Sequence, residues 1–168
     1  MATFTDFITY WENIAKNHKS IKHTSSDMHF CRLELEEVLS GLKSELNYPA
    51  LIVETYDWRM QDLSSDNVLK QRTCGVMVLD RCDDRGNFSD DVTTLSTIES
   101  IIDDILTLIR HHRDEMEHNV VMEFDMNTID VVPVIGTFDN LYGFRIVFDM
   151  KSGFNPDIDT TKWITTNF

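Results

Sequence analysis

The sequence contains little that would bind phosphate, cross-link a fold or span a membrane. Its six glycines are scattered, so they cannot form a phosphate loop or a dinucleotide fingerprint. The three cysteines, Cys31, Cys74 and Cys82, form no CxxC pair, which argues against a disulfide framework or a zinc knuckle and favours buried, reduced thiols. No apolar run approaches the roughly 20 residues of a membrane span. The first residues, MATFTDFITYWENIAK, lack the basic start and apolar block of a secretory signal.

Basic residues are also few. The chain has 15 Lys and Arg against 29 Asp and Glu, a formal net charge of −14. This balance repels nucleic acid and anionic membranes, and solubility is its simplest explanation. With 168 residues, 42% of them hydrophobic, the chain suits one domain, residues 1–168, that buries its own core. We therefore expect a cytoplasmic protein with no nucleic-acid or membrane partner.

One long periodic segment organises the rest of the chain. Residues 89–116, SDDVTTLSTIESIIDDILTLIRHHRDEM, carry apolar side chains at steps of three and four, which predicts a helix. Further apolar residues widen this face, as expected for a helix that lies across a sheet. Asp90 and Asp91 complement the positive end of the helix dipole, and the RHHR run of residues 110–113 complements its negative end.

Two more helices are predicted near the N-terminus. Residues 4–17 place a dense aromatic and aliphatic stripe on one side, which is typical of a core helix and also suits docking onto a neighbouring subunit. Residues 28–46 repeat apolar side chains with helical spacing and end before Pro49.

Four strands complete the prediction. Residues 50–60 and 70–80 read as an antiparallel pair joined by a long loop, and residues 119–135 and 142–150 as a second pair. Pro133 cannot donate to a ladder, which indicates a sheet edge, a bulge or a strand exit. We therefore expect an α+β fold: a mostly antiparallel sheet of about four strands, a long helix across one face and two N-terminal helices. Residues 1–48 form the helical region, 49–150 the α+β core and 151–168 an irregular tail.

The sequence offers no clear catalytic constellation. His111, Glu115 and His118 would share a helical face if the helix continued that far, and two imidazoles with a carboxylate can hold a divalent metal. A solvated helix end explains the same HHRDEMEH run, and we favour that interpretation. The sequence therefore predicts a protein that is not an enzyme, with no catalytic residue, cofactor or metal.

The segment TFDNLYGFRIVFDM, residues 137–150, resembles small structural proteins encoded in prophage tail modules. The element order over residues 49–150 is similar to that of tail-terminator or tail-completion proteins of long-tailed phages, although the two N-terminal helices depart from the most compact members. The resemblance implies a ring, commonly a hexamer, that caps the tail tube and accepts the head. It implies homo-oligomerisation, other phage tail proteins as partners, and no catalytic residues.

Five residues follow as candidate interaction residues. Asp139, Asn140 and Tyr142 would shape the turn into the last strand, where local turn chemistry is the simpler explanation. Arg145 lies on the strand face opposite the aromatics, and Trp163 indicates that the tail packs on this chain or on a neighbour. Two alternatives stay open beside a tail-assembly protein. One is a cytoplasmic α+β protein-binding module with an acidic surface, and the other is a metal-dependent enzyme built on His111, Glu115 and His118.

Overall fold

The computed structural model describes residues 1–32, 46–62, 68–82, 87–137, 140–155, 157–162 and 164. Three α-helices, six strands and a short 3-10 helix (η2) are assigned within these residues. In chain order they are α1 (Phe4–Asn17), β1 (Phe30–Arg32), β2 (Ala50–Val53), β3 (Asp57–Asp62), β4 (Val68–Arg81), α3 (Phe88–Asp114), α4 (Asn119–Met122), β5 (Phe124–Thr137), β6 (Leu141–Gly153) and η2 (Thr160–Lys162). The α+β class is confirmed.

The sheet is larger and less uniform than predicted. Its strands follow the order β1-β2-β4-β6-β5, and β3 pairs with β4 further along that strand. All pairs are antiparallel except β1 with β2, which is parallel. The expectation of about four mostly antiparallel strands is therefore wrong in number, and the sheet is mixed. Pro133 does lie on an edge strand, because β5 pairs with β6 alone among the described strands.

The second N-terminal helix is not present at the start of its predicted range. Residues 30–32 form β1 and pair with residues 51–53 of β2. A strand of three residues is too short to show a period of its own, so the helical spacing that follows it dominated the prediction. Residues 33–45, the larger part of that predicted helix, lie outside the described residues.

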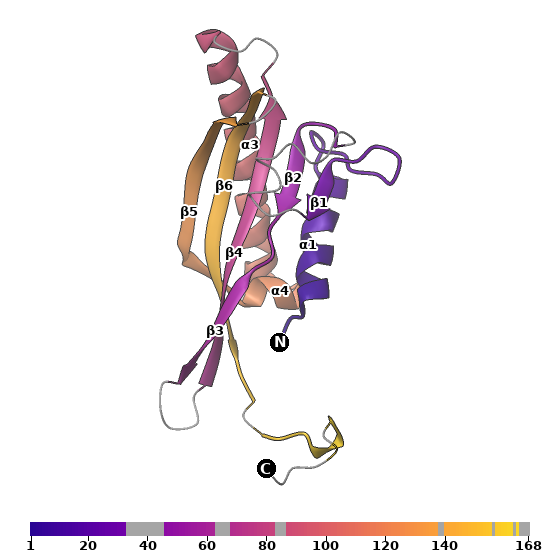
Figure 1. Ribbon diagram of the computed structural model, residues 1–168, viewed down its shortest axis with the longest axis vertical. Coiled ribbons are helices and arrows are strands. Elements are labelled where there is room, and N and C mark those ends of the chain that lie inside the picture. Colours follow the sequence, from indigo (N-terminus) through magenta and orange to yellow (C-terminus); the bar gives the residue numbers. More distant parts are fainter. Residues whose placement is uncertain are drawn as a thin grey trace.

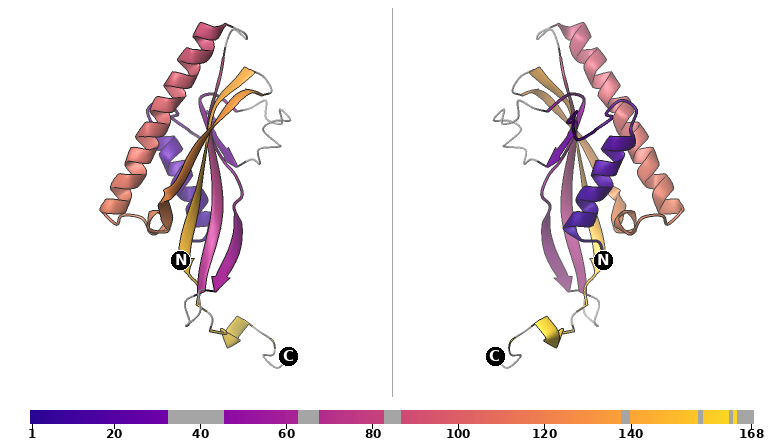
Figure 2. Two further views of the ribbon diagram at one scale, coloured as in Figure 1. Left: turned by 90° about the vertical axis from the view of Figure 1, so that its left-hand side faces the viewer. Right: turned by 90° about the vertical axis from the view of Figure 1, so that its right-hand side faces the viewer.

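Both main helices lie on the same face of the sheet (Figures 1 and 2). Helix α1 contacts β1 and β2, whereas α3 contacts β4 and β6, so the long helix lies across the sheet as predicted. Thr3 and Asp6 begin α1 with reciprocal side-chain-to-backbone hydrogen bonds, and Asn87 caps α3 by accepting from the N–H of Ser89. The aromatic stripe of α1 is core: Phe7, Trp11 and their neighbours are buried with the isoleucines of α3.

A buried ion pair ties the helices to the sheet. Arg72 of β4 is 1% exposed, and its guanidinium donates to the carboxylate of Glu123, between α4 and β5. Arg72 also donates to the carbonyl oxygen of Ala2 (3.1 Å) and lies over the ring of Tyr56. The N–H of Ala2 donates to Glu123 (2.7 Å), so the chain ahead of α1 is fixed to the same pair. These partners offset part of the desolvation of both charges, whereas Nε of Arg72 is buried without a hydrogen-bond partner among the described residues.

The opposite face of the sheet carries no helix among the described residues. A smaller core lies at one end of it, around Ile52, Met77 and Leu79. All three cysteines are buried and none forms a disulfide, as predicted. None of the helices in the described part of the chain combines the length and the apolar character needed to cross a membrane.

Candidate functional site

Three of the five predicted interaction residues, Asn140, Tyr142 and Arg145, are described, and they lie at the start of β6 and along it. Asn140 adopts a left-handed conformation with φ 57°, and its carbonyl oxygen accepts from the N–H of Cys82 (2.9 Å). Tyr142 is buried. Asn140 therefore makes a turn contact within this chain. Asp139 and Trp163 lie outside the described residues.

Arg145 is paired inside the chain. Its Nη2 lies 2.6 Å and its Nε 2.9 Å from the two carboxylate oxygens of Glu54, which follows β2. Both side chains are on the helix-free face of the sheet, as the alternation of β6 predicts, and Gly75 of β4 lies beneath them. The arrangement makes Arg145 a structural residue of this face, because the two-pronged contact occupies most of its guanidinium.

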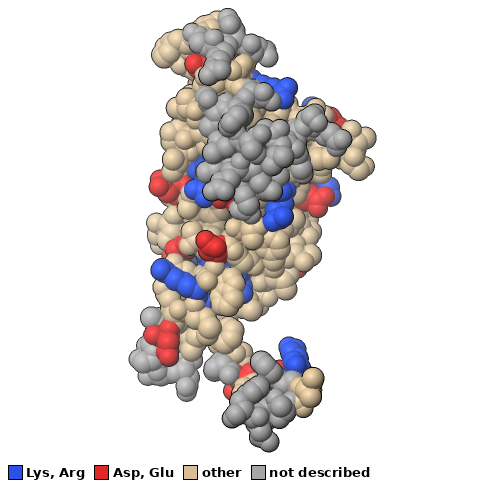
Figure 3. All heavy atoms as spheres, viewed as in Figure 1, with Lys and Arg blue, Asp and Glu red and all other residues tan. Residues whose placement is uncertain are grey.

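Further along the same face, polar side chains connect neighbouring strands. Gln71 of β4 donates to Asp149 of β6 (2.6 Å), and the hydroxyl of Thr73 donates to the same carboxylate (2.8 Å). Lys151 of β6 pairs with Asp125 of β5 (2.8 Å). Figure 3 views this face: described acidic and basic side chains are interspersed on it, and neither sign forms a continuous patch. The acidic excess of the chain is therefore not concentrated here.

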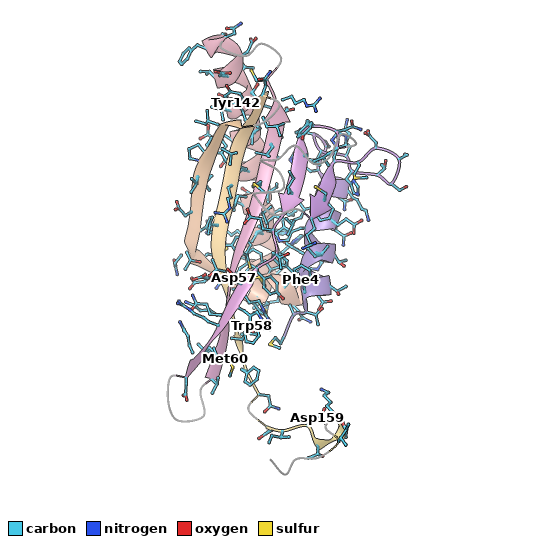
Figure 4. All side chains as sticks on the ribbon, viewed as in Figure 1. Phe4, Asp57, Trp58, Met60, Tyr142 and Asp159 are labelled. Atoms are coloured by element: carbon cyan, nitrogen blue, oxygen red, sulfur yellow. The ribbon has the colours of Figure 1, made fainter. Side chains whose placement is uncertain are left out.

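Strands β3 and β4 form an arm, defined here as residues 57–62 and 68–73, whose far end extends past the helices (Figure 1). Trp58 and Met60 point to one side of it, 56% and 49% exposed, and lie beyond Phe4 along the long axis of the molecule (Figure 4). The ammonium group of Lys70 lies 4.4 Å from the centre of the Trp58 ring. Trp58 and Met60 are neighbours on one side of β3, and exposed apolar side chains that lie together in this way make a candidate interaction surface.

The chain after β6 also leaves the body (Figures 1 and 2). The described hydrogen bonds of residues 155–162 are local, such as those from Thr161 to Asp159. Ile158 is 65% exposed, and Ile164 is fully exposed. This C-terminal segment therefore presents apolar side chains that its own chain does not cover.

Helix α3 ends in a tight reversal rather than continuing to His118. Met116 adopts a left-handed conformation with φ 56°, its N–H donates to the carbonyl of Arg113, and the N–H of Glu117 donates to that of His112. These two bonds define a Schellman motif. The reversal returns Glu117 to the helix turn that carries His112, with Oε2 3.6 Å from Nε2.

The reversal changes which metal-ligating groups come together. Among the described residues, the cluster is His112, Glu117 and His118, with one nitrogen or oxygen of each within 4.8 Å of the others. His111 and Glu115 of the predicted set are not in it, because the helix ends at Asp114 and the shared face does not continue. His118 is common to both sets.

A cavity of about 890 Å³ opens beside this cluster. Its wall is formed by α1, by the start of α4 and by the end of α3, with Asp6, Tyr10, Asn13, His112, Glu117 and His118 among the lining residues. The hydroxyl of Tyr10 forms a hydrogen bond with Nδ1 of His112 (3.0 Å). The imidazole rings of His112 and His118 pack edge to face, with their centroids 4.6 Å apart. The cavity therefore combines apolar helix surface with converging polar groups.

Burial shifts the pKa of both side chains in the Tyr10–His112 hydrogen bond. Desolvation lowers the pKa of His112, and the neighbouring His118 acts in the same direction, against the carboxylate of Glu117. Desolvation also raises the pKa of Tyr10. Near neutral pH this pair is therefore an uncharged phenol bonded to a neutral imidazole, the form of histidine that binds metals.

No protein-family model matches the chain, and a comparison with curated proteins finds no significant relative.

Sequence reasoning missed two features of these sites. The sequence predicts a strand over residues 50–60, but nothing local indicates that the helices end before reaching Trp58 and Met60. A left-handed residue at position 116 was also unforeseen, since glycine or asparagine usually marks that position and the sequence has methionine.

Proposed function

We propose that this chain is a non-enzymatic structural protein of phage tail assembly, which works as a ring of identical copies in the manner of a tail terminator or tail-completion protein. The observation that carries the proposal is the arm, whose exposed Trp58 and Met60 have no covering element among the described residues. The proposal places assembly in the cytoplasm and names other tail proteins as partners.

The exposed apolar side of the arm favours a partner. The arm itself belongs to a three-stranded part of the sheet, because residues 69–73 of β4 also pair with residues 149–153 of β6. The arm has the cation–π contact of Lys70 with Trp58 on its apolar side, while about half of both Trp58 and Met60 stays in water. Aromatic residues and methionine are enriched in protein interfaces. A neighbouring copy that covers this side gains the apolar burial that the isolated chain lacks.

Charge does not select the surface that the arm meets. The arm carries the cations Arg59 and Lys70 and also the exposed carboxylates of Asp57 and Asp62. A contact between two different surfaces generates a ring when the rotation between copies closes.

Light scattering coupled to size-exclusion chromatography tests the proposal. We expect the full chain to elute as an oligomer of one defined mass over a hundredfold range of concentration. The double variant Trp58→Ser/Met60→Ser should shift toward single chains. Met122→Ser is the matched control, because Met122 is 45% exposed on α4 and outside the arm. A wild-type chain that stays monomeric, or equal loss of assembly in the control, would contradict the proposal.

A second candidate is a protein-binding module that uses its acidic surface. It is favoured by the exposed carboxylates of α3, which carries Glu99, Asp103 and Asp104 on its solvent side. Under this alternative, charge-reversed α3 (Glu99→Lys/Asp103→Lys) loses a basic partner protein in a pull-down, while the wild-type chain remains monomeric. Under the first proposal the wild-type chain is instead an oligomer.

A further inference from the structure

We propose that His112, Glu117 and His118 bind a divalent transition-metal ion, with Zn²⁺ the best match to the ligand set. The inference is independent of the proposed assembly function. It starts from the three side chains that the end of α3 brings together, with one ligating atom of each within 4.8 Å of the others. Two imidazoles and one carboxylate suit zinc and its neighbours in the first transition row, whereas Ca²⁺ and Mg²⁺ take oxygen ligands.

The backbone holds the ligands in position. The Schellman hydrogen bonds fix Glu117 over the turn of His112, and His118 follows immediately as the first residue before α4. Bonds of about 2.0–2.1 Å in a tetrahedral zinc site place neighbouring ligand atoms about 3.3 Å apart. Nε2 of His112 and Oε2 of Glu117 are 3.6 Å apart. To bring all three ligand atoms to bonding distance of one ion, Glu117 and His118 must change rotamer, and both side chains are exposed.

Tyr10 orients the buried ligand. Its hydroxyl lies 3.0 Å from Nδ1 of His112, so the other ring nitrogen, Nε2, faces Glu117. Histidines that bind metals through one nitrogen usually donate the other N–H to an oxygen, which fixes the tautomer and the ring plane. With the metal on Nε2, Nδ1 keeps its proton and donates to Tyr10. The His118 side chain makes no capping hydrogen bond to α4, so it is available as a ligand.

Three protein ligands leave a coordination position open toward the cavity beside the cluster. Water or a small anionic ligand fits that position. The bound ion would connect the end of α3 with the start of α4, and α4 leads directly into β5. Metal binding to the folded chain therefore also stabilises it, by mass action.

The test is isothermal titration calorimetry of the full chain, freed of any affinity tag and treated with chelator, using ZnCl₂. We expect one zinc per chain. Glu117→Gln and His118→Ala should each weaken binding at least tenfold and abolish the zinc-induced rise in melting temperature. His111→Ala and Glu115→Gln are matched controls: they carry the same residue types at the same helix end, outside the cluster. Both should bind zinc within twofold of wild type.

Glu117 and His118 are exposed, so their variants should fold. A variant of His112 would also lose the contact with Tyr10, so the test does not use one. Circular dichroism of each metal-free variant checks its fold. Substitution with Co²⁺ should give the visible band of four-coordinate cobalt with nitrogen and oxygen ligands. No stoichiometric zinc binding by the wild type, equal weakening by His111→Ala and His118→Ala, or a cobalt–thiolate band from the cysteines would each overturn the proposal.

Discussion

Arg145 of β6 reaches across β4 to Glu54, and the two charged groups meet directly over Gly75. Nη2 of Arg145 lies 2.6 Å from Oε2 of Glu54, which is only 6% exposed. A Cβ atom at position 75 would lie 1.9 Å from that oxygen and 3.1 Å from Nη2. The glycine therefore provides the space in which a nearly buried carboxylate is neutralised.

Gly75→Ala should destabilise the protein, although alanine is ordinarily better than glycine in a strand by roughly 0.5–1 kcal/mol. The added methyl group displaces the carboxylate of Glu54 from Arg145. We expect a loss of about 1–2 kcal/mol in the free energy of unfolding, measured by urea denaturation.

Two further variants make that result specific. Gly153→Ala is the control, because nothing lies within 4 Å of a Cβ there, and we expect a change within about 0.5 kcal/mol. In a Glu54→Ala background the cost of Gly75→Ala should largely disappear, since the displaced group is gone. An equal cost in both backgrounds would show that the carboxylate is not the obstacle.

Arg145→Ala tests the pair from the other side. The variant leaves the nearly buried carboxylate of Glu54 without its cation. We expect a loss of about 2–3 kcal/mol in the free energy of unfolding, measured by urea denaturation. The loss should be smaller than for a fully buried pair, because Arg145 is one-third exposed. Lys151→Ala removes a more exposed partner, that of Asp125, and should cost less than Arg145→Ala does. Similar losses in the two variants would contradict the expectation that the more buried ion pair contributes more to stability.

Met116→Gly should stabilise the chain. Met116 ends α3 with φ 56°, a conformation that costs a side-chain-bearing residue roughly 1–2 kcal/mol and glycine very little. Glycine is also more flexible in the unfolded chain, so we expect a net gain of about 0.5–1 kcal/mol. Urea unfolding in the presence of chelator measures it. Met116→Ala removes the same side chain without relieving the backbone and should show no gain.

The loop after α1 should make stability depend on pH. Desolvation lowers the pKa of His23; Glu12 opposes this shift, and Lys16 and His29 reinforce it. Nδ1 of His23 accepts from the N–H of His29 (3.2 Å), which the protonated ring cannot do. Below the unfolded-state pKa of about 6.5 the unfolded chain binds more protons, so stability falls as the pH drops from about 7.5 toward the lowered folded-state pKa.

Urea unfolding at pH 7.5, 6.5 and 5.5 measures this loss. His23→Gln should lose less stability over the interval than wild type, and the part that remains includes His112, whose pKa burial also lowers. A steeper loss in His23→Gln would reverse the sign argued here.

Local patterns in the sequence predicted the two long helices well, but not the short α4, which lies at the start of the predicted strand 119–135. Residues 4–17 and 89–116 are long enough for amphipathic periodicity to place them, and the structure has Phe4–Asn17 and Phe88–Asp114. The alternation of residues 142–150 likewise separated Arg145 from the aromatic core face. Both signals are contained within a single element.

What the sequence did not reveal depends on distant contacts. The partner of Arg145 lies 91 positions away, and β1 exists because it pairs with β2 rather than through any strand signal of its own. The predicted set His111, Glu115 and His118 assumed a helix that in fact reverses at Met116. Because methionine does not mark such a reversal, the approach of Glu117 to His112 could be seen only in three dimensions.

Native mass spectrometry of the full chain tests the central claim most directly. The account predicts one closed oligomer as the main species, with no ladder of longer assemblies, and its loss to single chains when Trp58 and Met60 are both replaced by serine. Single chains alone for the wild-type protein at every concentration, or an open-ended series of masses, would contradict it.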